Sequence, residues 1–225
     1  MTSHVDPRFD FSAQGADQQV PALEHAIHLW VLDTGADGAR AVRIAARSTL
    51  ERLLRQYAGD AVFQIETGSH GKPFAPALPW LDFNLSHAGS HVALAFARNQ
   101  ALGVDIEEYS RKLAVEGLSR RFFGATEATA LARIAPEGRT AAFVQLWTHK
   151  EAVLKALGQG LSFGLDRVEF DLGDNGQAGR LRRIASSAGS VDEWQVQRFE
   201  PAAGLTGSIA WRGPARGLNL FRLSS

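Results

Sequence analysis

The sequence contains no cysteine. This absence excludes disulfide bonds, a catalytic thiolate and a cysteine-ligated zinc site. Any metal that the protein binds must therefore be held by oxygen or imidazole ligands. A chain without disulfides suits a reducing compartment, and we expect a cytoplasmic protein.

Long apolar runs are also missing. The longest, such as residues 92–97, are far shorter than the roughly 20 residues of a membrane-spanning helix. Residues 1–19 are polar and mixed in charge, without the basic start and apolar stretch of a signal peptide. We therefore expect no membrane partner, and we interpret residues 1–20 as a disordered leader.

The sequence has no excess charge of either sign, because 24 Lys and Arg balance 24 Asp and Glu. No overall field therefore favours nucleic acid, and any recognition of anions must come from local clusters. With 225 residues, of which 45% are hydrophobic, the chain can bury a full core as one large domain or as two lobes of about 100 residues each.

Hydrophobic periodicity predicts an α+β protein. A polar break at Asn99 and Gln100 divides it into an N-terminal lobe, residues 21–101, and a C-terminal lobe, residues 102–225. The predicted strands are 27–32, 63–66, 83–86, 91–97, 102–107, 168–172, 194–199, 205–211 and 218–223, with a turn at 173–176. The predicted helices are 40–57, 115–123, 126–134 and 139–157. We expect the later strands to form an antiparallel sheet.

The predicted helix 139–157 carries charge where packing calls for apolar side chains. At 100° per residue, Lys150 lies in the middle of its apolar stripe, and Glu151 and Lys155 lie on the edge. One interpretation is structural: Lys150 extends its charged end to solvent, and Glu151 pairs with Lys155 at the i, i+4 spacing. The other is that these groups line a functional site.

The predicted helix 40–57 shows the same anomaly. Arg43 lies in its apolar stripe and Arg47 lies at the edge. One such arginine carries no signal, and the structural interpretation is favoured for this helix taken alone. The alternative is that Arg43 and Arg47 line a functional site.

Two carboxylates lie two residues apart on the predicted strand 102–107. Asp105 and Glu107 therefore project from one face of a segment that is otherwise apolar. An exposed face would explain them, but a bound cation explains them better in a core strand. With Glu151 as a third carboxylate they would form an all-oxygen site of the kind that Mg²⁺ prefers, usually shared with substrate phosphates.

Two shorter signals lie between these elements. Ser86 and His87 end a predicted strand, where side chains can face a cleft. We do not interpret them as a hydrolase pair, because adjacency in sequence is not the geometry of a nucleophile and its base. Gly71-Lys72-Pro73 places a lysine on a rigid turn, which suits a phosphate.

Four motifs in order resemble those of the 4′-phosphopantetheinyl transferases. They are Gly71-Lys72-Pro73, Asn84-Leu85-Ser86-His87, Gly103-Val104-Asp105-Ile106-Glu107 and the helix segment from Trp147 to Ala156. The chain is similar to the surfactin-type subfamily, roughly over residues 27–172. The resemblance implies two similar α+β lobes in a pseudo-twofold arrangement, with the active site in the cleft between them. It also implies transfer of the phosphopantetheine arm of coenzyme A to a serine of an apo acyl or peptidyl carrier protein, with release of adenosine 3′,5′-bisphosphate.

The resemblance also assigns roles to the residues noted above. Asp105, Glu107 and Glu151 would hold Mg²⁺ on the diphosphate, and Glu151 would act, directly or through water, as the base for the carrier serine. Lys155 would face the departing phosphate, and Lys150 would hold phosphates or orient Glu151. The coenzyme A contacts implied are Arg43, Arg47, Lys72, Ser86, His87, Asp105, Lys150 and Lys155, with the choice between the two arginines open. The segment between the acidic strand and the long helix, including Phe122 and Phe123, is where this family usually meets its carrier. Taken alone, these two aromatic residues are more typical of a core.

Two other classes remain open from the sequence. One is a coenzyme A-binding protein of the same fold without turnover, and the other is a Mg²⁺-dependent nucleotide phosphohydrolase, which would use water as acceptor. A cleft closed within one chain favours a monomer. The motifs do not distinguish carriers of fatty acid, polyketide, nonribosomal peptide or siderophore assembly.

Overall fold

The computed structural model describes residues 11–14, 19–110 and 112–223. It is an α+β protein, as the periodicity predicted. Most of the expected disordered leader, residues 1–10 and 15–18, lies outside the described residues. The described part of that leader includes strand β1 (Ser12–Gln14), which pairs in parallel with the last strand. No described helix is both long enough and apolar enough to cross a bilayer.

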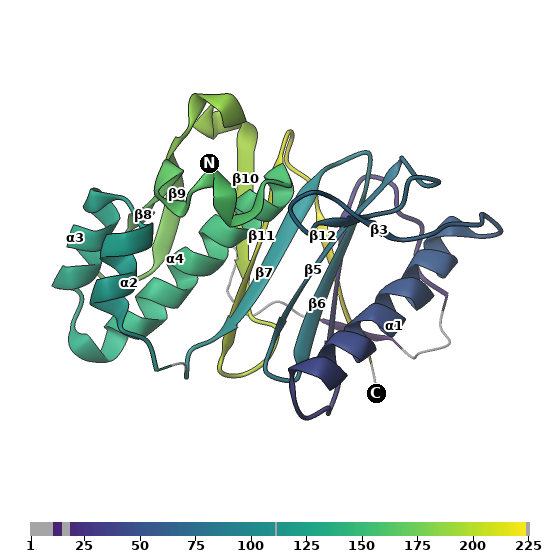
Figure 1. Ribbon diagram of the computed structural model, residues 1–225, viewed down its shortest axis with the longest axis horizontal. Coiled ribbons are helices and arrows are strands. Elements are labelled where there is room, and N and C mark those ends of the chain that lie inside the picture. The colour runs from purple at the N-terminus through teal and green to yellow at the C-terminus, as the bar shows by residue number, and fades with distance from the viewer. Residues whose placement is uncertain (1–10, 15–18, 111, 224–225) are drawn as a thin grey trace.

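Five strands form one sheet in the order β1-β12-β2-β6-β5. Besides β1, these strands are β12 (Leu218–Leu223), β2 (Ile27–Asp33), β6 (His91–Arg98) and β5 (Leu81–Ala88). Helix α1 (Ala39–Ala58) covers one face of this sheet, as Figure 1 shows. Gly38 and Gly59, both with positive φ, bound the helix on its two sides.

Three further strands form an antiparallel sheet in the order β10-β11-β7. They are β10 (Trp194–Phe199), β11 (Leu205–Arg212) and β7 (Leu102–Glu108). Helix α4 (Pro136–Leu157) crosses beside β7 and β11 (Figure 1). Pro136 begins the helix, and Gly158 ends it in the left-handed conformation at φ 70°.

The remaining elements surround α4. Helices α2 (Val115–Phe122) and α3 (Ala125–Arg133) and the hairpin of β8 (Val168–Leu172) and β9 (Ala178–Ile184) lie on the same side of the molecule as α4 (Figure 1). A two-stranded ribbon of β3 (Glu66–Thr67) and β4 (Pro73–Phe74) precedes β5.

The core of the protein joins the two sheets. Along β6, Val92, Leu94 and Phe96 pack under α1, whereas the intervening alanines face the core that β2 and β6 share with β7 and β11. This is the two-residue period of a strand buried on both faces. The buried Asn84 on β5 accepts a hydrogen bond from the backbone N–H of Val104 on β7 (3.0 Å), so a side chain ties the sheets together where their edges meet.

Most predicted elements are confirmed. The short strands β1 and β4 were not predicted, and three further differences concern longer or later strands. The predicted strand 63–66 is reduced to β3, which begins at Glu66. Strand β9 was not predicted, because its sequence Ala-Gly-Arg-Leu-Arg-Arg-Ile has only two buried or half-buried apolar positions beyond its start. Strand β12 does not extend the later antiparallel sheet as expected; it returns to the first sheet and pairs in parallel with β2. The division at residue 101 and the pseudo-twofold relation stay predictions.

Candidate active site

A cleft of about 560 Å³ lies where the two sheets meet. Segments far apart in the sequence line it: α1, the turn before β4, β5, β7 and α4. The lining residues are Arg43, Ala46, Arg47, Leu50, Gly71, Pro73, Leu85, Ser86, His87, Asp105, Ile106, Glu107, Trp147, Glu151 and Lys155. Eight of the ten residues predicted as functional are therefore brought together here, all except Lys72 and Lys150.

Asp105 is a nearly buried carboxylate held by two side chains of the cleft. Its side chain is 8% exposed, and Oδ1 accepts hydrogen bonds from Ser86 Oγ at 2.8 Å and from Lys155 Nζ at 2.7 Å. Within the described part of the chain, Oδ2 is buried and has no hydrogen-bond partner. A buried carboxylate oxygen without a partner is costly unless a cation or donor fills the place beside it.

Glu151 stands where negative charge accumulates. Burial first, and then the neighbouring charges of Asp105 and Glu107, raise the pKa of its carboxyl to about 7, while the ammonium of Lys155 opposes the shift. Glu151 lies one helical turn before Lys155 on α4, so both face β7. Three carboxylates that repel one another across a cleft are the chemistry that a divalent cation relieves.

The three carboxylates of Asp105, Glu107 and Glu151 fit a hard cation such as Mg²⁺, which prefers oxygen ligands. One of their oxygens, Asp105 Oδ2, has no hydrogen-bond partner in the part of the chain that the structure describes. Among the described residues, however, no three acidic or histidine side chains already close around a point that could hold a metal ion. The fit rests on the donor set and its electrostatics, not on a formed coordination sphere.

Gly103 sets the distance between β7 and α4. A Cβ at this position would lie 2.1 Å from the carbonyl oxygen of Ala152 and 2.4 Å from the backbone nitrogen of Ala156. The helix backbone can therefore approach the strand only because Gly103 has no side chain. The approach allows Lys155 Nζ to reach the carbonyl oxygen of Val104 at 3.0 Å as well as Asp105.

Basic and polar side chains line the opposite wall. Arg43 and Arg47 extend from α1 and are exposed, and Arg47 Nε donates to Glu51 Oε1 at 2.7 Å. His87 is exposed at the end of β5. An exposed ion pair of this kind contributes little to stability, so Arg47 can exchange its partner for a ligand at small cost.

Lys72 does not line the cleft, although the flanking Gly71 and Pro73 do. Its Nζ donates to the carbonyl oxygen of Leu102 at 2.9 Å, which ties the turn to the start of β7. Burial lowers the pKa of Lys72, and the charge of Asp82 partly offsets this effect. The sequence placed a lysine on a rigid turn correctly but could not show the direction of its side chain.

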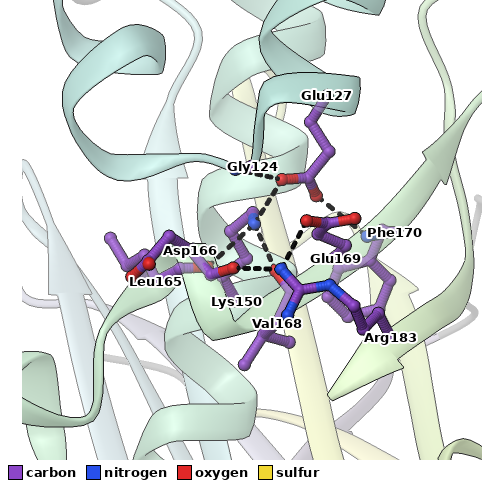
Figure 2. A network of polar contacts seen from close by, with 9 residues as sticks. All are labelled: Gly124, Glu127, Lys150, Leu165, Asp166, Val168, Glu169, Phe170 and Arg183. Carbon is purple, nitrogen blue, oxygen red and sulfur yellow. Dashed lines mark hydrogen bonds and ion pairs between the residues drawn. The ribbon is translucent and has the colours of Figure 1, made fainter. Parts of the chain in front are cut away.

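Lys150 also lies away from the cleft. Its side chain is 0% exposed and points into the interior, where Nζ lies 2.5 Å from Glu127 Oε2 on α3 (Figure 2). The prediction that Lys150 lies in the apolar stripe of this helix is therefore confirmed. Its ammonium, however, forms an ion pair in the interior and does not line the cleft.

Two residues of the site, Gly103 and Trp147, were recognised only as members of motifs and were given no role of their own. Trp147 lines the cleft beside Glu151, yet an aromatic residue on an apolar stripe is usually core. Gly103 follows a polar break, and nothing in one sequence distinguishes a glycine that permits close packing from a glycine in a strand edge. Glu127, the partner of Lys150, resembles any acidic residue in the first turn of a helix.

Comparison with known proteins is consistent with this geometry. Residues 101–203 match the model of the 4′-phosphopantetheinyl transferase superfamily. The chain is 38% identical over 107 residues to a 4′-phosphopantetheinyl transferase of Bacillus subtilis, covering 48% of this chain and 46% of the relative. It is 36% identical over 134 residues to 4′-phosphopantetheinyl transferase Sfp of Bacillus subtilis strain 168, covering 60% and 58%. It is 39% identical over 113 residues to 4′-phosphopantetheinyl transferase psf-1 of Bacillus pumilus, covering 50% and 47%.

These matches confirm the resemblance to the 4′-phosphopantetheinyl transferase superfamily and to its surfactin-type members. The matched segment contains Asp105, Glu107, Glu151 and Lys155, so the acidic strand and the charged helix both lie within it. The aligned regions span about half the length of these curated relatives.

Proposed function

We propose that this protein transfers the 4′-phosphopantetheine arm of coenzyme A to a serine of an apo acyl or peptidyl carrier protein. The products are the holo-carrier and adenosine 3′,5′-bisphosphate. The observation that carries the proposal is the meeting of Asp105, Glu107, Glu151 and Lys155 in one cleft, opposite the basic wall of α1 and His87. We further propose that the protein works as a monomer in the cytoplasm, without nucleic acid or membrane as partner.

The basic wall suits the phosphates of coenzyme A, which carries a 3′-phosphate as well as a diphosphate. Arg43, Arg47 and His87 are exposed to the cleft and can donate charge-assisted hydrogen bonds to phosphate oxygens. Gly71 and Pro73 bring backbone to the same wall, and Lys72 holds their turn in place through Leu102. We propose that Lys72 serves the cofactor through this turn.

Asp105, Glu107 and Glu151 would hold Mg²⁺, with the unpartnered Oδ2 of Asp105 as one ligand atom. When bound, the ion would supply positive charge to the diphosphate oxygens, where negative charge grows as the bond to phosphorus breaks. Ser86 and Lys155 keep Asp105 in place by hydrogen bonds to Oδ1, which leaves Oδ2 directed elsewhere.

Glu151 and Lys155 supply the proton and charge chemistry. A serine hydroxyl is a weak nucleophile until a base accepts its proton, and Glu151 is the carboxylate on the α4 side of the cleft that could do so, directly or through water. Lys155 gives two hydrogen bonds to the protein and remains 25% exposed at the cleft. We propose that it stabilises the phosphate that leaves with the adenosine portion.

The test measures release of adenosine 3′,5′-bisphosphate from coenzyme A and Mg²⁺, with and without apo-carriers from several assembly systems. The proposal predicts release that depends on an apo-carrier and equals the number of serines modified. Equal release without any carrier would identify the phosphohydrolase. Coenzyme A binding without release, across every carrier class, would identify the binding protein.

A further inference from the structure

Lys150 is a buried lysine whose ammonium is fully used. Its Nζ donates to Glu127 Oε2 at 2.5 Å, to the carbonyl oxygen of Leu165 at 3.0 Å and to that of Val168. An ammonium has three N–H groups, so no donor remains for a substrate phosphate.

Glu127 is satisfied in the same way. Oε2 accepts from Lys150 and from the backbone N–H of Gly124 at 3.2 Å, and Oε1 accepts from the backbone N–H of Phe170 at 2.8 Å (Figure 2). Every partner of the carboxylate is a donor and every partner of the ammonium is an acceptor. This pattern fits an ion pair. Burial raises the pKa of Glu127 and lowers that of Lys150, while the charge of each partner opposes the shift of the other.

The pair joins four pieces of chain at one point. Lys150 belongs to α4, Glu127 to α3, and Leu165 to the short 3₁₀ helix Leu165–Arg167. Val168 and Phe170 belong to β8. Gly124 lies at the start of α3, and a Cβ there would lie 2.2 Å from Glu169 Oε1, so the segment between α2 and α3 packs tightly against β8.

Aromatic rings connect this junction to the cleft. Lys150 Nζ lies 4.6 Å from the centre of the Phe123 ring, which stacks on Phe143 at 4.9 Å and tilts against Trp147 at 6.3 Å. Phe122 meets Trp147 edge-on at 5.9 Å. Trp147 in turn lines the cleft beside Glu151, the next helical turn along α4.

Phe122, Phe123 and Trp147 form one cluster of rings, which we call the aromatic wall. Of the three, Trp147 lines the cleft from α4, whereas Arg43, Arg47 and His87 line it from α1 and β5. Phe122 and Phe123 lie behind Trp147, at the end of α2, and contact its ring. A small cavity of about 110 Å³ between Glu107, Trp147 and Leu113 adjoins the same wall. A displacement of α3 would therefore change the α4 side of the cleft and leave the basic side in place.

We propose that Glu127 and Lys150 are positioning residues for the transfer reaction: their ion pair holds the aromatic wall so that the acceptor serine meets Glu151 correctly. The inference rests on the proposed function, and it assigns Lys150 to the protein interior and not to the phosphates. Neither side chain touches substrate. Both act through Phe123 and Trp147.

The test compares Glu127→Gln, Lys150→Met and the double variant with the wild type. Arg182→Met is the matched control. It breaks the exposed ion pair of Arg182 with Asp171 at 3.0 Å, and neither residue lines the cleft. Urea unfolding gives the folded fraction, and kcat and both KM values are expressed per folded molecule. Removing one partner of a buried pair is destabilising, so the assays are run at a temperature where each variant is folded.

The proposal predicts that each single variant loses about tenfold or more in kcat/KM for the apo-carrier, since small misplacements of reacting groups have large effects on rate. The KM for coenzyme A stays within about twofold, and the double variant is no worse than the poorer single variant, because the two residues act as one unit. The proposal would be overturned if kcat/KM for the apo-carrier, per folded molecule, were the same in the two pair variants as in Arg182→Met. A rise in the KM for coenzyme A with Lys150→Met that Glu127→Gln does not share would also overturn it, since Lys150 would then contact the cofactor.

If no carrier is modified, that result counts against the proposed function and not against the positioning role of Glu127 and Lys150. A second measurement then tests the positioning role. The fluorescence of Trp147 is obtained as the difference between each protein and its Trp147→Phe counterpart. Displacement of the aromatic wall should shift this difference emission in Glu127→Gln and in Lys150→Met but not in Arg182→Met. An unchanged emission in the two pair variants would show that the wall does not depend on the pair.

Discussion

Lys155 Nζ lies 2.7 Å from Asp105 Oδ1, across the junction of α4 and β7. The contact joins a helix to a strand 50 residues earlier in the chain, and it leaves Oδ2 of the aspartate buried without a partner among the described residues. One side chain is thus both the anchor of a lysine and a candidate metal ligand.

Asp105→Asn should remove the metal-dependent activity while the protein remains folded. The amide keeps the shape of the side chain but loses the charge that attracts a cation. We expect less than about a tenth of the wild-type rate at saturating Mg²⁺, a loss of more than about 1.4 kcal/mol in transition-state stabilisation. Rates per folded molecule and the Mg²⁺ concentration for half-maximal rate are the measurements, with Asp171→Asn on the exposed surface as the control. A normal rate and a normal Mg²⁺ requirement would contradict the metal assignment.

Lys155→Met should reduce turnover more than stability. The variant removes the ammonium from the cleft but keeps the apolar stem, and Asp105 retains its bond from Ser86. We expect a loss of about tenfold or more in kcat, and about 1 to 3 kcal/mol in the free energy of unfolding because a buried carboxylate loses one partner. Steady-state kinetics and urea titration measure the two effects. If the folded variant keeps full activity while its free energy of unfolding falls as expected, the Lys155–Asp105 ion pair has only a structural role.

Gly103→Ala should separate α4 from β7. The new methyl group would meet the backbone of Ala152 and Ala156, which cannot rotate away as a side chain can. We expect a stability loss of about 1 to 3 kcal/mol and a fall in kcat in the folded protein, because Glu151 and Lys155 move with the helix. Gly117→Ala is the control, since a Cβ there meets nothing within 4 Å. Equal activity in the two variants would show that the spacing is not critical.

Much of the site was predictable because charge in an apolar pattern is conspicuous. Asp105 and Glu107 alternate within a buried strand, and Arg43 interrupts the stripe of α1, so each was recognised from spacing alone. The direction of a long side chain was not predictable in the same way. Lys72 and Lys150 both turn to interior acceptors, and their partners Leu102 and Glu127 are 30 and 23 residues distant.

The fold shows the same limit. Strands and helices with clear periodicity were confirmed within a few residues, but pairing between distant strands was not encoded locally. β12 resembles one more strand of an antiparallel series, and its parallel place beside β2 follows from the core that Phe221 shares with Trp30. Phe221 and Trp30 are 191 residues apart in the sequence, so no local pattern could have indicated their contact.

Acid should destabilise the protein through His28, which is buried between Tyr57 and Phe221. Burial lowers its pKa from 6.5 to about 4. Well above pH 6.5 the imidazole is neutral in both states, so its titration does not affect stability. As pH falls from 6.5 to 4 the unfolded chain binds a proton that the folded chain does not, and up to about 3 kcal/mol is lost.

Chemical denaturation of the wild type and His28→Gln at several pH values measures this effect. The slope between pH 6.5 and 4 should be smaller in His28→Gln, whereas His70→Gln, which changes an exposed histidine, should retain it. His149, whose burial also lowers its pKa to about 4, adds a slope of the same sign that remains in both variants. An identical pH dependence in His28→Gln and the wild type would show that His28 does not stay neutral in the fold.

The most direct measurement of the central claim is the intact mass of an apo-carrier after incubation with this protein, coenzyme A and Mg²⁺. The account predicts the gain of one phosphopantetheine arm, with no gain when the acceptor serine is replaced by alanine, when Mg²⁺ is chelated or when Asp105→Asn replaces the wild type. A carrier that gains the arm equally well with Asp105→Asn would show that the chemistry lies outside this cleft. Carriers of every class that remain unmodified by the wild type would contradict the transferase assignment itself.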